Sequence, residues 1–188
     1  MELVWPAAVY LAGYVDALER GWSPNTERAE ASQEELALIK EDAAAFVKSR
    51  VDREAKGPAI VLPGGGLARR LPGYTMWMWD GEFCGSINFR WQPGTTELPP
   101  TCPGHIGYAV VPWKRGRGYA TEALRQLLLR VREEGLPFVE LTTGQQNVAS
   151  QRVLEKCGAR LVERFERPAE LGGGLNLRFR IRLGASHA

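Results

Sequence analysis

The chain has 188 residues, of which 44% are hydrophobic, and a formal net charge of +2 from 24 basic and 22 acidic side chains. This length and composition suit a globular protein with its own core. A net charge so close to zero argues against a nucleic-acid partner, and the sequence has no run of about 18 apolar residues to span a membrane.

The first 73 residues predict helices and a loop. Residues 6–19 have apolar side chains at helical spacing. Ser32 and Glu35 have the spacing of a capping box, and the apolar residues after them predict a second helix that runs to about residue 53. Residues 62–73 are rich in Gly and Pro, which predicts a loop or a weak hairpin.

Strand-like alternation begins at residue 74. The segment "YTMWMWDGEFCGSINFRW" (74–91) consists of two alternating runs around Asp80-Gly81, a pair typical of tight hairpin turns. The proline-rich residues 92–104 predict an irregular connection. The segment "HIGYAVV" (105–111) then predicts a third strand.

The last part of the chain combines helices and strands. Its patterns predict an amphipathic helix over 118–134, a strand over 137–143, a short helix over 147–159 and alternating strands over 160–167 and 175–183. One strand–helix–strand unit among antiparallel hairpins predicts a mixed α+β fold.

The cysteines and the N-terminal segment bear on location. Cys84, Cys102 and Cys157 are odd in number and lack the spacing of metal ligands. We therefore expect reduced thiols in a cytoplasmic protein without a metal site. Glu2 and Asp16, together with the lack of a basic leading segment, argue against a signal peptide.

The segment "KRGRGYA" (114–120) places two glycines among three cations where a helix must start. The first turn of a helix leaves backbone N–H groups free and carries partial positive charge, and glycine lets a ligand approach the backbone. The turn therefore predicts a phosphate site. Lys114, Arg115 and Arg117 would add long-range attraction.

Other interpretations of this turn stay open. It fits no P-loop pattern, and the dinucleotide pattern G-x-G-x-x-G would need a glycine at Thr121. Glu140 lies about 20 residues farther on, as a nicotinamide dinucleotide enzyme would require, but antiparallel strands precede the turn. A solvated bend is the simplest alternative.

Residues 115–120 also fit the pattern [QR]-x-x-G-x-[GA], and here the chain resembles the GNAT superfamily of N-acetyltransferases. The likeness extends over "GHIGYAVVPWKRGRGYATEAL" (104–124). The segment "NVASQRVLEKCGA" (147–159) is similar to the superfamily motif N-x-x-[AS]-x-x-x-[YL]-E-K-x-G. The core resemblance covers residues 74–166, and the whole chain resembles a bacterial branch of predicted acetyltransferases with unassigned substrates.

The resemblance implies a single domain over residues 1–188, composed of an N-terminal helical part and loop (1–73), an acetyl-CoA-binding core (74–166) and a C-terminal strand (167–188). It implies an α+β fold with a central, mostly antiparallel twisted sheet flanked by helices. The fourth and fifth strands, 105–111 and 137–143, would splay apart. The pantetheine arm of the co-substrate acetyl-CoA is expected between them.

The resemblance also assigns co-substrate contacts by motif position. The main chain that pairs with the pantetheine arm would be that of Tyr108, Ala109, Val110 and Val111. The turn around the pyrophosphate would consist of Arg115, Gly116, Arg117, Gly118, Tyr119, Ala120 and Thr121. Asn147 would lie near the pantetheine or fix the loop beneath it, and from the sequence it is equally suited to cap the following helix.

Proton transfer is less well defined by the resemblance. Many superfamily members carry a Tyr, seven residues after the Asn, that protonates the departing CoA thiolate, and here that position is Leu154. Ser150 is implied as a candidate donor by likeness to ribosomal-protein N-terminal acetyltransferases. Because a serine hydroxyl is a weak acid, we expect it to hydrogen-bond the thiolate or to relay a proton from water. The alternative for Ser150 is a small helix residue at a tight packing point.

For the general base we predict His105, because an imidazole titrates near neutral pH. Glu140 and Glu82 are the rivals, and a strand-end residue bonded to the 92–104 loop is the alternative for His105. His187, the other histidine, is next to the last residue, where we expect disorder.

Two features of the 74–91 hairpin bear on the acceptor site. Trp77 and Trp79 are two residues apart and should share a face of their strand. We favour core packing for them over a wall of the acceptor pocket. Asp80 and Glu82 flank the turn, where we expect solvated side chains.

The leading hypothesis is an N-acetyltransferase that moves the acetyl group of acetyl-CoA to a primary amine by direct attack in a ternary complex. The acceptor would be a small molecule or a peptide, with no nucleic-acid or membrane partner, and a homodimer is compatible with the sequence. The alternative is a non-catalytic CoA-binding or ligand-sensing module, which the missing Tyr favours.

Overall fold

The structure is a computed structural model that describes residues 1–62 and 64–184, so His187 lies outside the described residues. The helices are α1 (Ala8–Glu19), α2 (Ala31–Glu41), α3 (Ala43–Ser49), α4 (Tyr119–Val131) and α5 (Val148–Lys156), with short 3-10 turns η1 (Pro112–Lys114), η2 (Arg132–Glu134) and η3 (Ala169–Leu171). The strands are β1 (Glu2–Val4), β2 (Val51–Asp52), β3 (Ile60–Val61), β4 (Leu67–Ala68), β5 (Gly73–Trp79), β6 (Phe83–Arg90), β7 (Ile106–Val110), β8 (Phe138–Gly144), β9 (Arg160–Glu166) and β10 (Leu175–Arg182).

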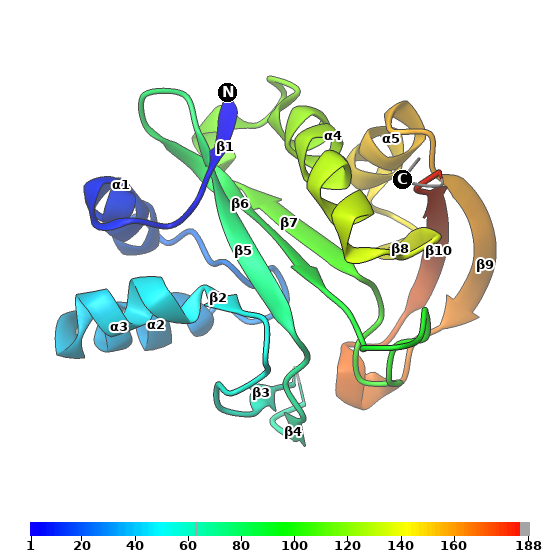
Figure 1. Ribbon diagram of the computed structural model, residues 1–188, viewed down its shortest axis with the longest axis horizontal. Coiled ribbons are helices and arrows are strands. Elements are labelled where there is room, and N and C mark those ends of the chain that lie inside the picture. Colours follow the sequence, from blue (N-terminus) through cyan, green and yellow to red (C-terminus); the bar gives the residue numbers. More distant parts are fainter. Residues whose placement is uncertain (63, 185–188) are drawn as a thin grey trace.

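Two antiparallel sheets form the centre of the molecule (Figure 1). One has the order β1-β5-β6-β7, with β2 also paired to β5, and the other has the order β8-β10-β9. The strands β7 and β8 are consecutive in the chain, joined through α4, yet they belong to different sheets. This arrangement confirms the mixed α+β fold with two splayed strands.

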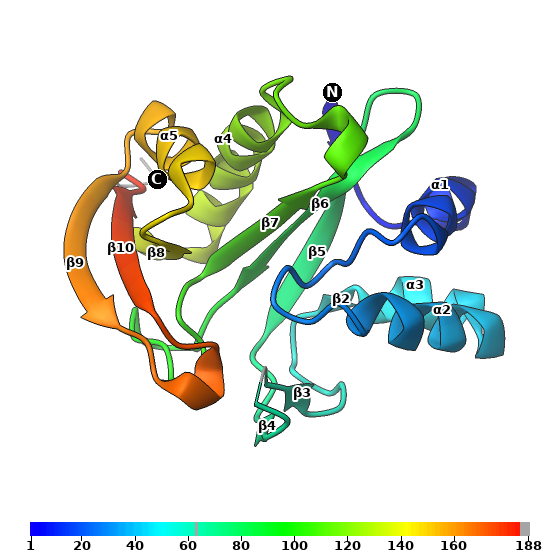
Figure 2. The ribbon, with the colours of Figure 1, turned by 180° about the vertical axis from the view of Figure 1, so that it is seen from behind.

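The helices form two groups (Figures 1 and 2). The first, α1 to α3, packs beside the larger sheet, and the second, α4 and α5, lies together near β7 and β8. Each face of β5 accordingly has its own core. Met76 and Met78 pack with α4, whereas Trp77 packs on the opposite face and stacks on Tyr14 of α1 with 4.6 Å between the ring centroids. The core-packing interpretation of Trp77 is therefore confirmed.

The second predicted helix is wrong in one respect, because it is broken into α2 and α3. Asp42 between them is extended, with φ −153° and ψ 94°, and its carboxylate accepts the Ala45 amide at 2.9 Å as the N-cap of α3. The predicted capping box also does not form. Ser32 lies inside α2, and Glu35 pairs with Arg50 at 2.9 Å instead.

Neither β1 nor β2 was predicted as a strand: β1 precedes the first predicted helix, and β2 lies where the second helix was expected to continue to about residue 53. Residues 2–4 and 51–52 add β1 and β2 to the edge of β5. The β3–β4 ribbon lies at the loop or weak hairpin predicted nearby. None of the helices in the described residues has the length and apolar character of a membrane span.

Candidate functional site

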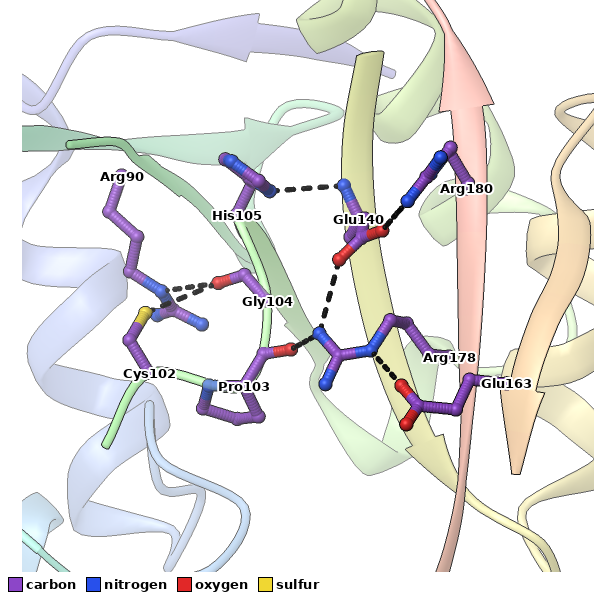
Figure 3. A network of polar contacts seen from close by, with 9 residues as sticks. All are labelled: Arg90, Cys102, Pro103, Gly104, His105, Glu140, Glu163, Arg178 and Arg180. Atoms are coloured by element: carbon purple, nitrogen blue, oxygen red, sulfur yellow. Dashed lines mark hydrogen bonds and ion pairs between the residues drawn. The ribbon is translucent and has the colours of Figure 1, made fainter. Parts of the chain in front are cut away.

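The two sheets meet where β7 is about to begin (Figure 3). The His105 amide donates to the Glu140 carbonyl at 2.7 Å, and the Glu140 amide donates to Nδ1 of His105 at 3.0 Å. We call this pair of residues the junction. Beyond it β7 and β8 continue in separate sheets, and we call their divergence the splay.

His105 is completely buried, with 0% of its surface exposed. Burial lowers the pKa of His105 to about 4, although the Glu140 carboxylate acts in the opposite direction. Because Nδ1 accepts the Glu140 amide, the ring proton belongs on Nε2, which has no hydrogen-bond partner among the described residues. A neutral imidazole whose lone pair is already engaged is a poor base. This geometry argues against direct proton transfer at His105, and its role as general base stays a prediction.

The carboxylate of Glu140 is also engaged (Figure 3). One of its oxygens accepts from Arg180 at 2.6 Å, and the other accepts from Arg178 at 3.1 Å. Arg178 pairs in addition with Glu163 at 2.8 Å. Two guanidinium groups therefore occupy the oxygens that a general base would use, so Glu140 is suited to holding the junction.

A pocket of about 410 Å³ lies beside the junction, and Glu140 is part of its wall. Aromatic rings and arginines line it together. Arg180 lies 4.0 Å over the ring of Phe138, and Arg178 lies 5.0 Å over the ring of Phe165. The pocket thus offers both a polar wall and apolar surfaces next to the point where the two sheets meet.

The other end of β7 leads through η1 into the glycine-rich turn and α4. Gly116 and Gly118 have φ values of 75° and 79°, in the left-handed region that favours glycine, and a Cβ on either would meet open space. The Glu122 amide makes the first bond of α4, to the Gly118 carbonyl at 3.1 Å. The amides of residues 119–121 precede that bond and lack an acceptor within the helix. The turn therefore fits a negatively charged pyrophosphate.

Two of the three cations predicted to attract phosphate are exposed, and the third is not. Arg115 and Arg117 are exposed. Lys114 is only 6% exposed, and its ammonium donates to Asp80 at 2.5 Å and pairs with Glu82 at 3.0 Å. The predicted role of Lys114 is therefore wrong, because two carboxylates already neutralise its charge.

Asp80 is an exposed turn residue, as predicted, but its carboxylate is not simply solvated, because only 17% of the side chain is exposed. Its carboxylate accepts from Lys114 and, at 2.5 Å, from the hydroxyl of Tyr119. Burial alone would raise the pKa of Asp80, but these hydrogen bonds outweigh it and hold the pKa well below its usual value. We call Asp80, Lys114 and Tyr119 the clamp, because they tie the β5–β6 hairpin to the glycine-rich turn.

Only alternate residues of β7 face the splay. The Val111 amide donates to a carbonyl of β6 at 2.9 Å, and the Ala109 carbonyl lies so close to β6 that a Cβ on Gly85 would come within 2.3 Å of it. Alternate backbone groups of a strand point to opposite edges, which leaves Tyr108 and Val110 facing the splay. Of the four positions predicted to pair with the pantetheine arm, Ala109 and Val111 therefore point to β6, and the Val110 carbonyl already accepts from Nε of Arg115 at 3.3 Å.

The helix α5 borders the splay from the other side. The Asn147 side chain accepts the Ser150 amide at 3.1 Å, so the predicted helix cap is confirmed. The Ser150 hydroxyl forms a hydrogen bond of 2.8 Å with the hydroxyl of Tyr108. Leu154 is 1% exposed and packs in the core. Sequence reasoning considered only the main chain of Tyr108 and missed its hydroxyl.

The chain matches the model of the acetyltransferase (GNAT) domain family over residues 20–160, which is most of its length. It belongs to the GNAT acetyltransferase family. The predicted superfamily is therefore confirmed: the protein is an acetyltransferase with acetyl-CoA as co-substrate. A search of curated proteins found no relative with significant similarity.

Solved structures share the fold of this GNAT acetyltransferase. RimL, the ribosomal L7/L12 α-N-protein acetyltransferase in complex with coenzyme A, aligns with a TM-score of 0.63 at 11% identity, over 98% of this chain and 94% of that one. The microcin C7 self-immunity acetyltransferase MccE, in complex with acetyl-CoA and AMP, aligns with a TM-score of 0.59 at 14% identity, over 96% and 91% of the two chains. At such identities the likeness shows the fold alone.

Within residues 1–62 and 64–184, this GNAT acetyltransferase has no cluster of three or more His, Cys, Asp or Glu side chains that could hold a metal ion. Its three cysteines, Cys84, Cys102 and Cys157, are free thiols.

Proposed function

We propose that this acetyltransferase, acting as a single domain over residues 1–188, moves the acetyl group of acetyl-CoA to a primary amine by direct attack in a ternary complex. One observation carries the proposal: the splay of β7 and β8 leads into a turn whose helix amides are free. An extended arm that ends in a pyrophosphate matches that combination of a strand edge and an anion site.

We assign the co-substrate contacts accordingly. The amides of residues 119–121 would receive the pyrophosphate, and Gly116 and Gly118 would let it approach the backbone. The exposed Arg115 and Arg117 would add attraction. The main chain of Tyr108 and Val110 would pair with the pantetheine arm, and Asn147 would hold the start of α5 beside it.

For the acceptor we propose the pocket beside Glu140, because it adjoins the junction at the closed end of the splay. Acetyl-CoA supplies an activated acyl group there when it is bound. The amine nitrogen would bond to the acyl carbon as the carbon–sulfur bond breaks. His105 and Glu140 would hold the junction in place, and the proton of the amine would leave to water because their lone pairs are engaged.

The proposal is tested by two measurements on the wild-type chain. Calorimetry with acetyl-CoA should show binding, whereas NAD(P) should give no thermal shift. A panel of polyamines, amino sugars, lysine and peptides should then include at least one amine that releases CoA thiol. Binding without thiol release from any acceptor would favour the non-catalytic module, and a failure to bind acetyl-CoA would contradict the whole assignment.

A further inference from the structure

The hydroxyls of Tyr108 and Ser150 form a bridge between two elements that border the splay. Tyr108 comes from β7, Ser150 comes from the first turn of α5, and their oxygens are 2.8 Å apart. The Ser150 amide is held in turn by the cap residue Asn147 at 3.1 Å. Both the backbone and the hydroxyl of Ser150 are therefore fixed in position.

The bridge lies next to α5, the helix that carries Leu154 at the position where many superfamily members have a tyrosine. Leu154 is buried in the core and has no O–H to offer a departing thiolate. The phenol of Tyr108 comes from the strand instead, and it reaches α5 one turn before Leu154, at Ser150. The structure thus places a tyrosine hydroxyl beside α5, but this tyrosine belongs to β7 and not to the helix.

The chemistry of the bridge follows from counting protons. Two hydroxyls carry two O–H protons, and the bond between them uses one, so one proton remains free to donate. Burial raises the pKa of Tyr108 to about 12, so the phenol keeps its proton at neutral pH. A thiol has a pKa of about 8.5, so complete proton transfer from the phenol to a thiolate would be uphill. A charge-assisted hydrogen bond to the thiolate is favourable.

We propose that Tyr108 is a positioning residue for thiolate departure: its phenol donates to Ser150, which turns the serine proton toward the sulfur of CoA. This inference rests on the proposed function. As the acyl carbon bonds to the amine nitrogen, the carbon–sulfur bond breaks and its electron pair goes to sulfur. The amine proton leaves to water, and the thiolate, held by Ser150, takes a proton from water on release.

The test compares CoA with desulfo-CoA, which lacks the sulfur, by calorimetry between about pH 6.5 and a pH about one unit above the thiol pKa. A site that stabilises the thiolate lowers the pKa of the bound thiol. The affinity of wild type for CoA relative to desulfo-CoA should then rise with pH. The rise should be about tenfold for each unit by which binding lowers the pKa of the thiol. We expect a rise of at least about tenfold.

The variants locate that effect. Tyr108→Phe removes one oxygen and should abolish most of the rise, and Ser150→Ala should do the same, with desulfo-CoA binding unchanged. Tyr74→Phe is the matched control: Tyr74 is buried where Tyr108 is partly buried, burial also raises its pKa to about 12, and it lies on β5, two strands from the splay. It should keep the full rise.

Several results would overturn the inference. An equal rise in wild type and Tyr108→Phe would do so, as would wild type that binds both ligands without any rise. If Tyr108→Phe binds neither ligand, the Ser150→Ala variant provides the test, because the proposed hydrogen bond to sulfur requires the serine hydroxyl. A full rise in Ser150→Ala would then overturn the inference. Wild type that binds neither CoA nor desulfo-CoA would overturn the proposed function itself, and this inference with it.

Discussion

The two ends of the splay are built in opposite ways. At the junction, side chains hold the two sheets together. The buried imidazole of His105 accepts from the Glu140 amide, and two arginines donate to the carboxylate of Glu140. At the glycine-rich turn, the backbone itself would contact the proposed ligand, and Gly116 and Gly118 leave it without side chains there. Substitutions at the two ends should therefore have different consequences. Changes at the junction should alter stability and its pH dependence, and changes at the turn should alter affinity for acetyl-CoA.

The largest effect is expected at the junction, from His105→Gln. The pKa of His105 is about 4 in the folded protein and about 6.5 in the unfolded chain, so its contribution to stability is complete above pH 6.5 and is lost as the pH falls toward 4. That loss amounts to about 3 kcal/mol. Glutamine has no such titration and can still accept the Glu140 amide. Urea unfolding of both proteins across this pH range should show that the variant loses less free energy of unfolding than wild type as the pH falls. An equal loss in both proteins would contradict this role of His105.

The clamp is an exception to this contrast, because it brings one buried charged side chain, that of Lys114, to the open end. Among the residues that the structure describes, Asp80→Ala leaves Lys114 with the exposed Glu82 as its one carboxylate partner. We expect the free energy of unfolding to fall by about 2 kcal/mol. Asp16→Ala is the control, since the exposed pair of Asp16 with Arg20 should contribute about 0.5 kcal/mol. Equal losses in the two variants would show that the clamp does not stabilise the turn.

A smaller free-energy change, seen in binding, is expected at the turn itself. Gly118→Asp puts a carboxylate where the pyrophosphate should lie, and we expect acetyl-CoA affinity to fall by at least about tenfold, or about 1.4 kcal/mol. Gly94→Asp is a close match, because Gly94 also has a positive φ, 77°, and open space at its Cβ position. It introduces the same charge and backbone strain elsewhere. Calorimetry that gave both variants the same affinity would remove the turn from the site.

The smallest effect compares two helix caps. Asn147 caps α5, and Asp42 caps α3 through the same kind of bond. Each alanine variant should lose about 1 kcal/mol of stability. Because α5 borders the splay and α3 does not, Asn147→Ala should also weaken acetyl-CoA binding, whereas Asp42→Ala should not. An equal change of affinity in both variants would mean that α5 has no special part in the site.

Much of the fold and of the turn could be predicted because the signals are local. The Asp80-Gly81 pair sets a hairpin, and residues 115–120 form a compact pattern whose glycines do adopt positive φ at Gly116 and Gly118. Such features depend on neighbours in the chain. The break at Asp42 was missed because a helical pattern continues through it.

The contacts that decide electrostatics were not predictable in this way. Lys114 is buried because of Asp80, which is 34 residues away in sequence. The bridge from Tyr108 to Ser150 joins positions 42 residues apart. The link between His105 and Glu140 depends on how two sheets meet. No spacing rule reports such pairs, because strand register and helix packing create them.

We propose that acetyl-CoA binds along the edge of β7 that faces the splay and at the glycine-rich turn. Amide hydrogen exchange, resolved by residue with and without acetyl-CoA, tests it most directly. We expect slower exchange at the amides of Tyr108, Val110 and residues 119–121. The Val111 amide should change little, because it is already bonded to β6. Protection confined to other parts of the chain, with the turn unchanged, would contradict the account.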